Sequence, residues 1–376
     1  MKAPSLFLIF FLTLAICACE NPWMAEILES KTVTFNSNGG SHVSSQTLLK
    51  GERIQRPADP TKNGFDFAGW YTDNESFYEP YDFDYVPIMS MILHANWDPI
   101  LVFINSSELE EFLSGQLINT PSNPYIIKLN INDANDMEKI KETLTSDENT
   151  GKYVILDFSD STITSIRDHI FSNCYTLTGV ILPNVVTNIG NGVFEGCENL
   201  TTINVNNNNT YSSKDGVLYN QDGTILIACP SGKTGLFIIP DSVINIGDYA
   251  FPNCSKLTGI TIGKNVAAIG DYAFHSCISL TNVTIPDSVK NIGDRAFYYC
   301  TNLNNATIGK NVETIGDYAF YLCLKLNSVT FEDNIEADKF AESAFDDELY
   351  DVIYTPNNIE VKGTYKKDNS GSWYKL

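Results

Sequence analysis

Cysteine is the residue type in this sequence whose spacing most suggests chemistry. A zinc site needs thiolate ligands that converge tetrahedrally, whereas a repeated ladder points its side chains in parallel. Cysteine also behaves as a small hydrophobic residue that fits a tight inner corner. We therefore expect buried structural thiols, with disulfides between neighbouring rungs and metal binding as the alternatives. Six cysteines share one phase, at Cys174, Cys197, Cys254, Cys277, Cys300 and Cys323, while Cys229 has no assigned role.

The other ionisable residues give no sign of a catalytic centre. The four histidines, which are His42, His94, His169 and His275, fall in different predicted modules or distant repeats. The sequence contains no nucleophile-elbow, zinc-protease or phosphate-loop motif. Aspartates recur at Asp248, Asp271, Asp294 and Asp317. Capping of a short helix is their expected role, with weak calcium binding as the alternative. We predict no catalytic residues, no metal site and no cofactor, and therefore a protein that is not an enzyme.

The first 19 residues predict export. Lys2 precedes an apolar run from Leu6 to Ile16, and small residues follow, which is typical of a signal peptide over residues 1–18. The stretch from Ile16 to Cys19 resembles a bacterial lipobox, which implies cleavage before Cys19 and acylation of its thiol. Cys17 fits the motif less well, because Ile16 stands where a small residue is expected. A plain signal peptide is the alternative.

Composition limits the partners. The chain has 376 residues, which as a prior predicts two or three domains. Its 46 acidic and 24 basic residues give a net charge of -22. This charge repels nucleic acid and anionic lipid headgroups, so neither is expected as a partner. No second long apolar run follows the first, so the expected membrane association is through the N-terminal lipid alone.

Residues 32–98 follow a tether at 19–31 and predict a small β module. Four blocks occur in order: VTFNSNGG, DPTKNGFDFAGWYTD, YDF and LHANW. Together they resemble the B repeat of internalin-type surface proteins, and the resemblance implies a β-grasp-like fold. We expect the aromatic residues Trp70, Tyr71, Phe83 and Trp97 to form its core, with an exposed binding strip as the alternative.

Residues 99–160 predict a mixed segment that caps the part that follows. Ser107 and Glu110 fit a capping box before a short helix. A second helix is expected from Asp136 to Leu144, because Met137, Ile140 and Leu144 share one face. Strands are expected at residues 125–129 and 153–158.

From residue 161 to residue 334 the sequence repeats itself. Ile-Gly-Asp occurs at Ile246, Ile269, Ile292 and Ile315, 23 residues apart, and a related coil begins at Ile189. Each coil predicts a short strand and a short helix around a stacked core, which is a solenoid. In one coil, Ile269, Ala273, Phe274 and Cys277 face inward, and Gly270 permits a tight turn.

Consecutive units such as VINIGDYAFPNCSKLTGITIGKN and VKNIGDRAFYYCTNLNNATIGKN resemble the BspA-type leucine-rich repeat of bacterial surface proteins. The resemblance implies a leucine-rich-repeat solenoid that adheres to matrix proteins, host cells or other bacteria. Two coils depart from the pattern. The first has Arg167 and His169 in place of the usual glycine and tyrosine, and a later coil has Arg295 in the tyrosine position.

Two segments interrupt or end the repeat. Near residues 206–242 an insertion of 34 residues predicts a β-hairpin, with strands at 217–219 and 225–227. After Phe331 the period is expected to fail. Residues 335–376 then predict a C-terminal cap, with a helix from Ala341 to Phe345 and a strand near Trp373.

The outward strand positions are the candidate partner-binding surface. They carry small uncharged polar residues in every late coil: Thr258, Thr261, Thr281, Asn282, Thr284, Asn304, Asn305, Thr307, Asn327, Ser328 and Thr330. The β-propensity of threonine is the alternative explanation. A second row, which includes Tyr249, Tyr272 and Tyr318, is expected to pack the opposite side.

These observations predict a lipid-anchored adhesin of the cell envelope, exposed at the outer membrane. Its expected partners are protein or glycan ligands on host cells, extracellular matrix or other bacteria. A periplasm-facing spacer or assembly protein and a carbohydrate-active enzyme are the alternatives.

Overall fold

The computed structural model describes residues 30–62, 65–74, 77, 80–99, 102–133, 135–345, 349–354 and 361–376. The predicted signal peptide, Cys19 and most of the tether lie outside these residues. The chain divides into two compact units, Met1–Ile100 and Leu101–Leu376, and each is described by itself. Among the described residues, none of the helices has the length and apolar character that a membrane crossing requires.

Unit 1 is built on one four-stranded sheet. Its strands are β1 (Lys31–Asn36), β2 (Gln46–Leu48), β3 (Phe65–Tyr71) and β4 (Met91–Pro99). They lie in the order β2-β1-β4-β3, with β1 and β4 parallel at the centre and antiparallel pairs on both sides. Trp70 and Tyr71 are buried, and Phe83 and Trp97 pack against the same core. The small β-grasp-like module expected from the sequence is therefore present, and its aromatic residues are core residues.

Unit 2 begins with a mixed segment. Its elements are β5 (Val102–Ile104), α3 (Leu109–Ser114), β6 (Tyr125–Leu129), α4 (Asn135–Thr145), η1 (Asp147–Asn149) and β7 (Val154–Asp157). Met137, Ile140 and Leu144 are buried on α4, as their spacing predicted. The three strands pair in parallel and continue into the sheet of the first coils, so this segment closes the beginning of the solenoid.

The N-cap residue of α3 is Glu108, without a side-chain cap bond, and a box-like pair of bonds lies in the turn before it, two residues earlier than the sequence suggested. Asn105 Oδ1 accepts hydrogen bonds from the N–H groups of Ser107 and Glu108, at 2.9 and 3.1 Å. In return, the N–H of Asn105 donates to Glu108 Oε2 at 3.0 Å. The prediction of Ser107 with Glu110 was wrong because asparagine fills the same role as serine and begins the turn earlier.

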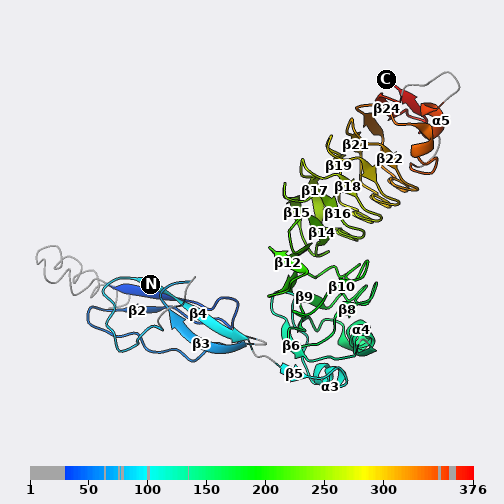
Figure 1. The fold of residues 1–376 in the computed structure, drawn as a ribbon. Coiled ribbons are helices and arrows are strands. Elements are labelled where there is room, and N and C mark those ends of the chain that lie inside the picture. Colours follow the sequence, from blue (N-terminus) through cyan, green and yellow to red (C-terminus); the bar gives the residue numbers. More distant parts are fainter. Residues whose placement is uncertain are drawn as a thin grey trace, which may run out of the picture. The chain divides into compact units, whose positions relative to one another are not determined.

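The repeat forms a stack of coils, which Figure 1 shows in green to orange. Strands on one side are β9 (Leu177–Leu182), β11 (Thr202–Val205), β15 (Gly235–Ile238), β17 (Leu257–Thr261), β19 (Asn282–Thr284), β21 (Asn305–Ile308) and β23 (Ser328–Phe331). Short strands on another side are β8 (Ser165–Ile166), β10 (Asn188–Ile189), β16 (Asn245–Ile246), β18 (Ala268–Ile269), β20 (Asn291–Ile292) and β22 (Thr314–Ile315). Successive coils pair in parallel with a 23-residue offset, for example Ile246 with Ile269. The predicted solenoid is therefore confirmed.

Phenylalanine rings stack along the inside of the solenoid. The centroid distances are 4.9 Å for Phe251–Phe274, Phe274–Phe297 and Phe297–Phe320, and 4.8 Å for Phe320–Phe345. These spacings match the separation of neighbouring strands, so backbone pairing and ring stacking impose the same repeat distance.

The part of each coil that follows Ile-Gly-Asp consists of turns, although the sequence predicted a short helix there. Tyr272 and Ser276 have φ values of 54° and 57°, and the matching residues of the other regular coils are also left-handed. A helix cannot continue through a left-handed residue, because its carbonyl and Cβ leave the helical path. We call this part of the coil the turn side.

The insertion contains more than the predicted hairpin. Strands β12 (Tyr211–Lys214), β13 (Val217–Asn220) and β14 (Ile225–Ala228) form an antiparallel meander, which includes the expected pairing of β13 with β14. However, β14 also pairs in parallel with β16, and β15 pairs with β17. Residues 224–242 therefore form an additional coil, and Cys229 is buried in its core.

The repeat also extends further than the sequence suggested. Residues 341–345 form turns and a bridge instead of the predicted helix. Phe340 and Phe345 form parallel bridges with Ile315 and Phe320, so the segment adds one more turn side. The prediction was wrong because this copy lacks Ile-Gly-Asp and keeps only Ala-Phe. η2 (Ala337–Lys339) precedes this segment, and α5 (Leu349–Ile353), β24 (Gly363–Lys367) and β25 (Trp373–Lys375) lie beyond it.

Candidate functional site

The predicted binding residues form one outward face on strands β17, β19, β21 and β23. Parallel pairing places Thr284 beside Thr307 and Thr307 beside Thr330. Between them on the same strands, Val283 and Val329 are buried, so the alternation of a β-strand turns the threonines outward. The structure brings the predicted row together as expected; whether it binds a partner stays a prediction.

The row is partly bonded to itself. Asn305 Nδ2 donates to Asn282 Oδ1 at 2.7 Å, which makes an amide ladder between adjacent coils. Thr330 and Thr364 hydroxyls lie 3.0 Å apart, because β24 pairs antiparallel with β23 and covers its outer edge. Thr258, Thr261, Thr281 and Thr284 remain exposed. The face therefore offers small uncharged hydrogen-bonding groups on a rigid support.

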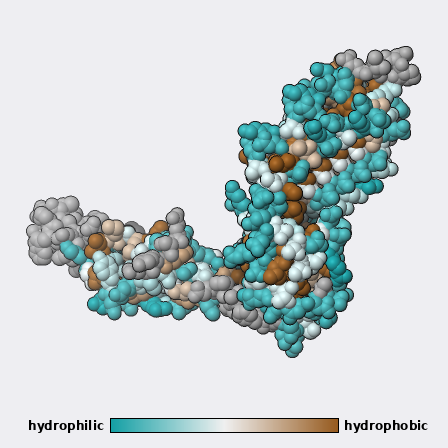
Figure 2. Space-filling model, viewed as in Figure 1, coloured by the Kyte–Doolittle hydropathy of each residue, from teal (hydrophilic) through white to brown (hydrophobic). Residues whose placement is uncertain are grey.

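Two exposed aliphatic residues adjoin this face. Leu236 and Ile238 on β15 are each 64% exposed and lie in register with Gly259 and Thr261 of β17. Figure 2 shows hydrophobic residues at the surface among these coils. They were not predicted, because the insertion was expected to form a hairpin alone. The alternation from Gly235 to Ile238 was the signal that could have found them.

The tyrosine row on the turn side is a stack. Tyr249 and Tyr272 have ring centroids 4.6 Å apart and nearly parallel planes. The guanidinium of Arg295 lies 5.4 Å from the Tyr272 ring and 5.0 Å from the Tyr318 ring. Arg295 therefore continues the stack by cation–π contact where the tyrosine is replaced. Because these ring faces are covered by their neighbours, the arrangement supports the expected packing role.

The repeated aspartates bond between coils instead of capping helices. The N–H groups of Asp271, Asp294 and Asp317 each donate to Oδ1 of the aspartate one coil earlier, at 2.9, 2.8 and 2.8 Å. The predicted acceptor role is correct, but the donor lies in the next coil, since no helix follows the aspartate. Among the described residues, no group of three or more His, Cys, Asp or Glu side chains could hold a metal ion.

Glycine follows the isoleucine for a reason that the sequence analysis did not identify. Gly270 was expected to permit a tight turn, but its φ is not positive. A Cβ on Gly270 would lie 2.5 Å from Asp248 Oδ1 and 2.7 Å from Asp248 N. Glycine is therefore required because the coils approach too closely for any side chain.

Two histidines that are far apart in sequence approach the same carboxylate. His169 Nδ1 lies 3.0 Å from Glu195 Oε2, and His275 Nε2 lies 3.8 Å from Glu195 Oε1. The two histidines lie in distant coils, as expected, but the additional coil is shortened on its turn side, and both rings approach Glu195. Burial lowers the pKa of His275 below its ordinary value, and Glu195 opposes this.

The ladder thiols are buried and free. The Sγ atoms of Cys277, Cys300 and Cys323 each lie 3.2 Å from a phenylalanine carbonyl oxygen of the preceding coil. Burial raises the pKa of Cys174 to about 12, so this thiol is not a nucleophile at neutral pH. The described geometry agrees with structural thiols. Cys229 is a further buried thiol, although it lies outside the 23-residue spacing of the other six.

Comparisons with known proteins agree with both units. Residues 32–96 match the Listeria-Bacteroides repeat domain. A putative membrane protein of Evansella cellulosilytica is 44% identical over 68 residues, which cover 18% of this chain and 10% of that protein. A putative Gly-rich membrane protein of the same organism is 43% identical over 68 residues, which are 18% of this chain and 8% of its length. The chain thus spans a small part of these relatives.

Solved structures of bacterial repeat proteins are similar to parts of this chain. A leucine-rich repeat protein from Eubacterium ventriosum is 24% identical, with a TM-score of 0.40 over 57% of this chain and 75% of that one. The pneumococcal vaccine antigen PcpA is 20% identical, with a TM-score of 0.42 over 66% and 65% of the two chains. The model of the BspA type leucine-rich repeat region matches in six copies over residues 126–234 and 229–350. Since this match spans more than half of the sequence, the chain belongs to the BspA type leucine-rich repeat family.

Proposed function

We propose that this chain is a lipid-anchored bacterial surface protein that adheres to protein or glycan ligands on host cells, matrix or other bacteria. The observation that carries the proposal is the in-register outward row of Thr284, Thr307 and Thr330. Nothing in the stacked core requires these side chains, since the buried residues of the same strands supply the packing. A flat row of small polar groups gives many modest hydrogen bonds to a partner.

The adjoining aliphatic pair strengthens the proposal. Leu236 and Ile238 hold large apolar side chains in water at the border of the polar row. Interfaces typically combine such an apolar centre with a polar rim. We expect the contact to be centred on β15 and β17, to be of moderate affinity, and to depend only weakly on salt because the row carries no charge.

The first test compares the strand face with the turn side. Thr284→Lys with Thr307→Lys should weaken binding to immobilised matrix proteins or whole cells by about tenfold, which is 1.4 kcal/mol, without lowering the melting temperature much. Tyr272→Ala with Tyr318→Ala is the paired comparison. If the tyrosine variant abolishes binding while folded and the lysine variant binds normally, the binding surface belongs on the turn side.

The second test addresses the aliphatic pair. Leu236→Ser with Ile238→Ser should also reduce binding by about tenfold, because apolar area is lost from the contact. Leu324→Ser is a matched control, since Leu324 is also 64% exposed but follows Cys323 on the turn side. Equal loss in both variants would show that exposed aliphatic residues contribute only nonspecific adhesion.

Anchoring and exposure are tested in cells. Cys19→Ser should leave the chain unprocessed and without fatty acid, because no thiol remains at the acylation position. Uptake of labelled fatty acid by this variant would refute the assignment. Protease treatment of intact cells should cleave the wild-type chain; protection until lysis would favour the periplasm-facing spacer.

A further inference from the structure

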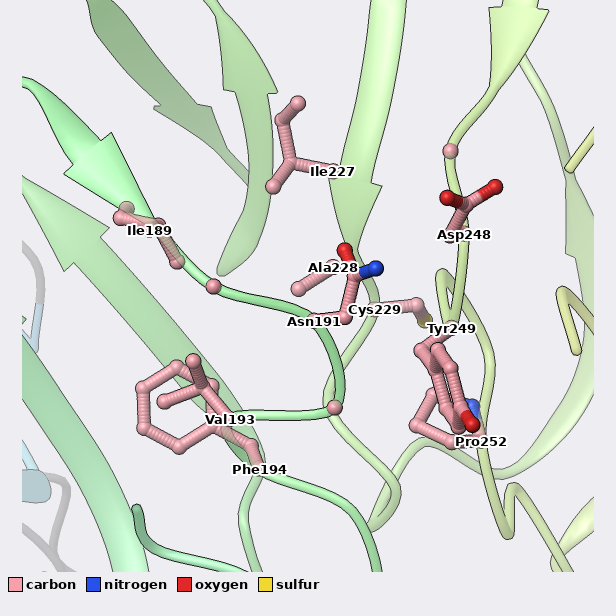
Figure 3. Close-up of a pocket in the computed structure, with 13 residues that line it drawn as sticks. Ile189, Asn191, Val193, Phe194, Ile227, Ala228, Cys229, Asp248, Tyr249 and Pro252 are labelled. Atoms are coloured by element: carbon pink, nitrogen blue, oxygen red, sulfur yellow. The ribbon is translucent and has the colours of Figure 1, made fainter. Parts of the chain in front are cut away.

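The additional coil is shortened on its turn side. Six residues, 229–234, connect β14 to β15, whereas ten residues, 247–256, connect β16 to β17. The short connection leaves a cavity of about 110 Å³ where the rest of a turn side would lie. Figure 3 shows its walls, with Asn191 and Phe194 on one side, Asp248 and Tyr249 on the other, and Ala228 between them. We call this cavity the slot.

One wall of the slot carries unused backbone donors. In a complete coil, the N–H groups of Tyr249 and Phe251 donate to Asp271 O and Ala273 O of the next coil, at 2.9 and 2.7 Å. Gly192 and Phe194 occupy the same positions two coils earlier and are buried. Their N–H groups make no hydrogen bond to a described residue. Buried N–H groups without an acceptor are rare, so this pair points to a ligand or ordered water.

The opposite wall carries an unused acceptor. The carbonyl oxygens of Asp271 and Asp294 accept hydrogen bonds from Tyr249 and Tyr272 of the preceding coils. The carbonyl of Asp248, at the matching position, accepts none from the described residues. The slot therefore presents donors on one side and an acceptor on the other, with a cavity of about 110 Å³ between them. An extended main chain offers the complementary acceptors and donors on its two edges.

The size and charge of the slot restrict the occupant. Its volume is below the roughly 150 Å³ of an apolar cavity that holds benzene, so only small side chains fit inside. Asn191 and Asp248 are exposed at the mouth, and Glu195 Oε2 lies 3.4 Å from the position that a Cβ on Gly192 would take. A basic residue outside the slot would complement the negative charges of Asp248 and Glu195.

We propose that the slot binds a short extended peptide segment of a partner protein, with glycine or alanine inside and a basic residue at the mouth. The peptide carbonyls accept from the N–H groups of Gly192 and Phe194, and a peptide N–H donates to Asp248 O. The site is separate from the strand face and does not rest on the proposed adhesion through that face.

The experiment measures amide hydrogen exchange by mass spectrometry, with acetyl-Lys-Gly-Ala-Gly-Ala-Lys-amide as the probe. Without the probe, Gly192 and Phe194 should exchange faster than Tyr249 and Phe251, which are already bonded. At saturating probe, exchange at Gly192 and Phe194 should slow about tenfold or more. No slowing would overturn the proposal, and slowing that rises with protein concentration alone would identify a second copy as the occupant instead.

Two variants test the location. Ala228→Phe fills the slot and should abolish the slowing, while Leu324→Phe places the same ring at an exposed turn-side position outside the slot and should leave it unchanged. Asn191→Lys, at the exposed mouth, should weaken the basic probe and favour acetyl-Glu-Gly-Ala-Gly-Ala-Glu-amide. If exchange still slows in Ala228→Phe, the probe binds elsewhere. The same conclusion follows if Asn191→Lys and the wild type respond alike to the basic and the acidic probe. None of these outcomes depends on the Thr284 and Thr307 lysine variants, so the two proposals fail separately.

Discussion

Asp248 and Asp271 are joined across neighbouring coils by a hydrogen bond of 2.9 Å, in which the N–H of Asp271 donates to Oδ1 of Asp248. The same bond recurs from Asp294 to Asp271, so a line of carboxylates runs along the solenoid. Each carboxylate satisfies a backbone donor of the next coil, but each also lies close to the charges of its neighbours. The line therefore stabilises the stack through its hydrogen bonds, while repulsion between neighbouring carboxylates opposes this to an extent that depends on pH.

Asp271 should make the solenoid more stable in mild acid. Burial is the largest cause that raises its pKa above 3.8; the charges of Asp248 and Asp294 raise it further, and the Asp294 N–H and Arg295 oppose this. A carboxyl with a raised folded-state pKa contributes stability that is complete below the unfolded pKa and is lost as pH rises through the folded pKa. As pH falls from 7 to about 4, the melting temperature of the wild type should rise relative to Asp271→Asn, which keeps the acceptor. A constant difference would contradict this.

Gly293→Ala should destabilise the stack. A Cβ on Gly293 would lie 2.5 Å from Asp271 Oδ1 and 2.7 Å from Asp271 N, so the coils would have to separate. We expect a loss of about 1–3 kcal/mol in the free energy of unfolding, measured by denaturant titration. Gly115→Ala is the matched control, because its nearest atom would be 3.6 Å away. Similar losses in both variants would show that coil contact is not the reason for glycine.

The sequence was sufficient to predict the solenoid because its repetition is visible in one chain. The 23-residue period identifies which residues are equivalent, and alternation within a strand separates inward Val283 from outward Thr284. The period does not show which group each polar side chain hydrogen-bonds to. Asp271 was assigned to a helix within its own coil because the donor, 23 residues away in sequence, becomes adjacent only after stacking.

Incomplete copies were the other source of error. The coil of residues 224–242 has no Ile-Gly-Asp and no Ala-Phe pair, so its marks as a coil are the alternation from Gly235 to Ile238 and the closing turn at Pro240. As a result, the exposed Leu236 and Ile238 and the approach of His169 and His275 to Glu195 were not predicted. Each depends on how much of a coil is missing, which is a property of the stack and not of any single repeat.

The described cysteines should react slowly in the folded protein. Burial raises the pKa of Cys197 and Cys300 well above 9.0, so little thiolate is present near neutral pH. In a chain beginning at Glu20, a thiol reagent should label almost none when folded and all seven, which include Cys229, after denaturation. Disulfide-linked peptides that join Cys254 to Cys277 would show that the rungs are oxidised instead.

His275 should produce a pH effect of the opposite sign. Its imidazole lies against Tyr272 and Tyr298, and burial lowers its pKa below 6.5 although the nearby Glu195 carboxylate raises it. A group with a depressed folded-state pKa contributes stability that is present above the unfolded pKa and is lost as pH falls through the folded pKa.

The wild type should therefore lose thermal stability relative to His275→Gln as pH falls from about 7.5 to about 5. Glu195→Gln should make this loss steeper, because it removes the charge that favours the protonated imidazole. A wild type that instead gains stability relative to His275→Gln in this range would mean that the ion pair with Glu195 outweighs burial, and a slope unchanged by Glu195→Gln would mean that the carboxylate does not act on His275 at all.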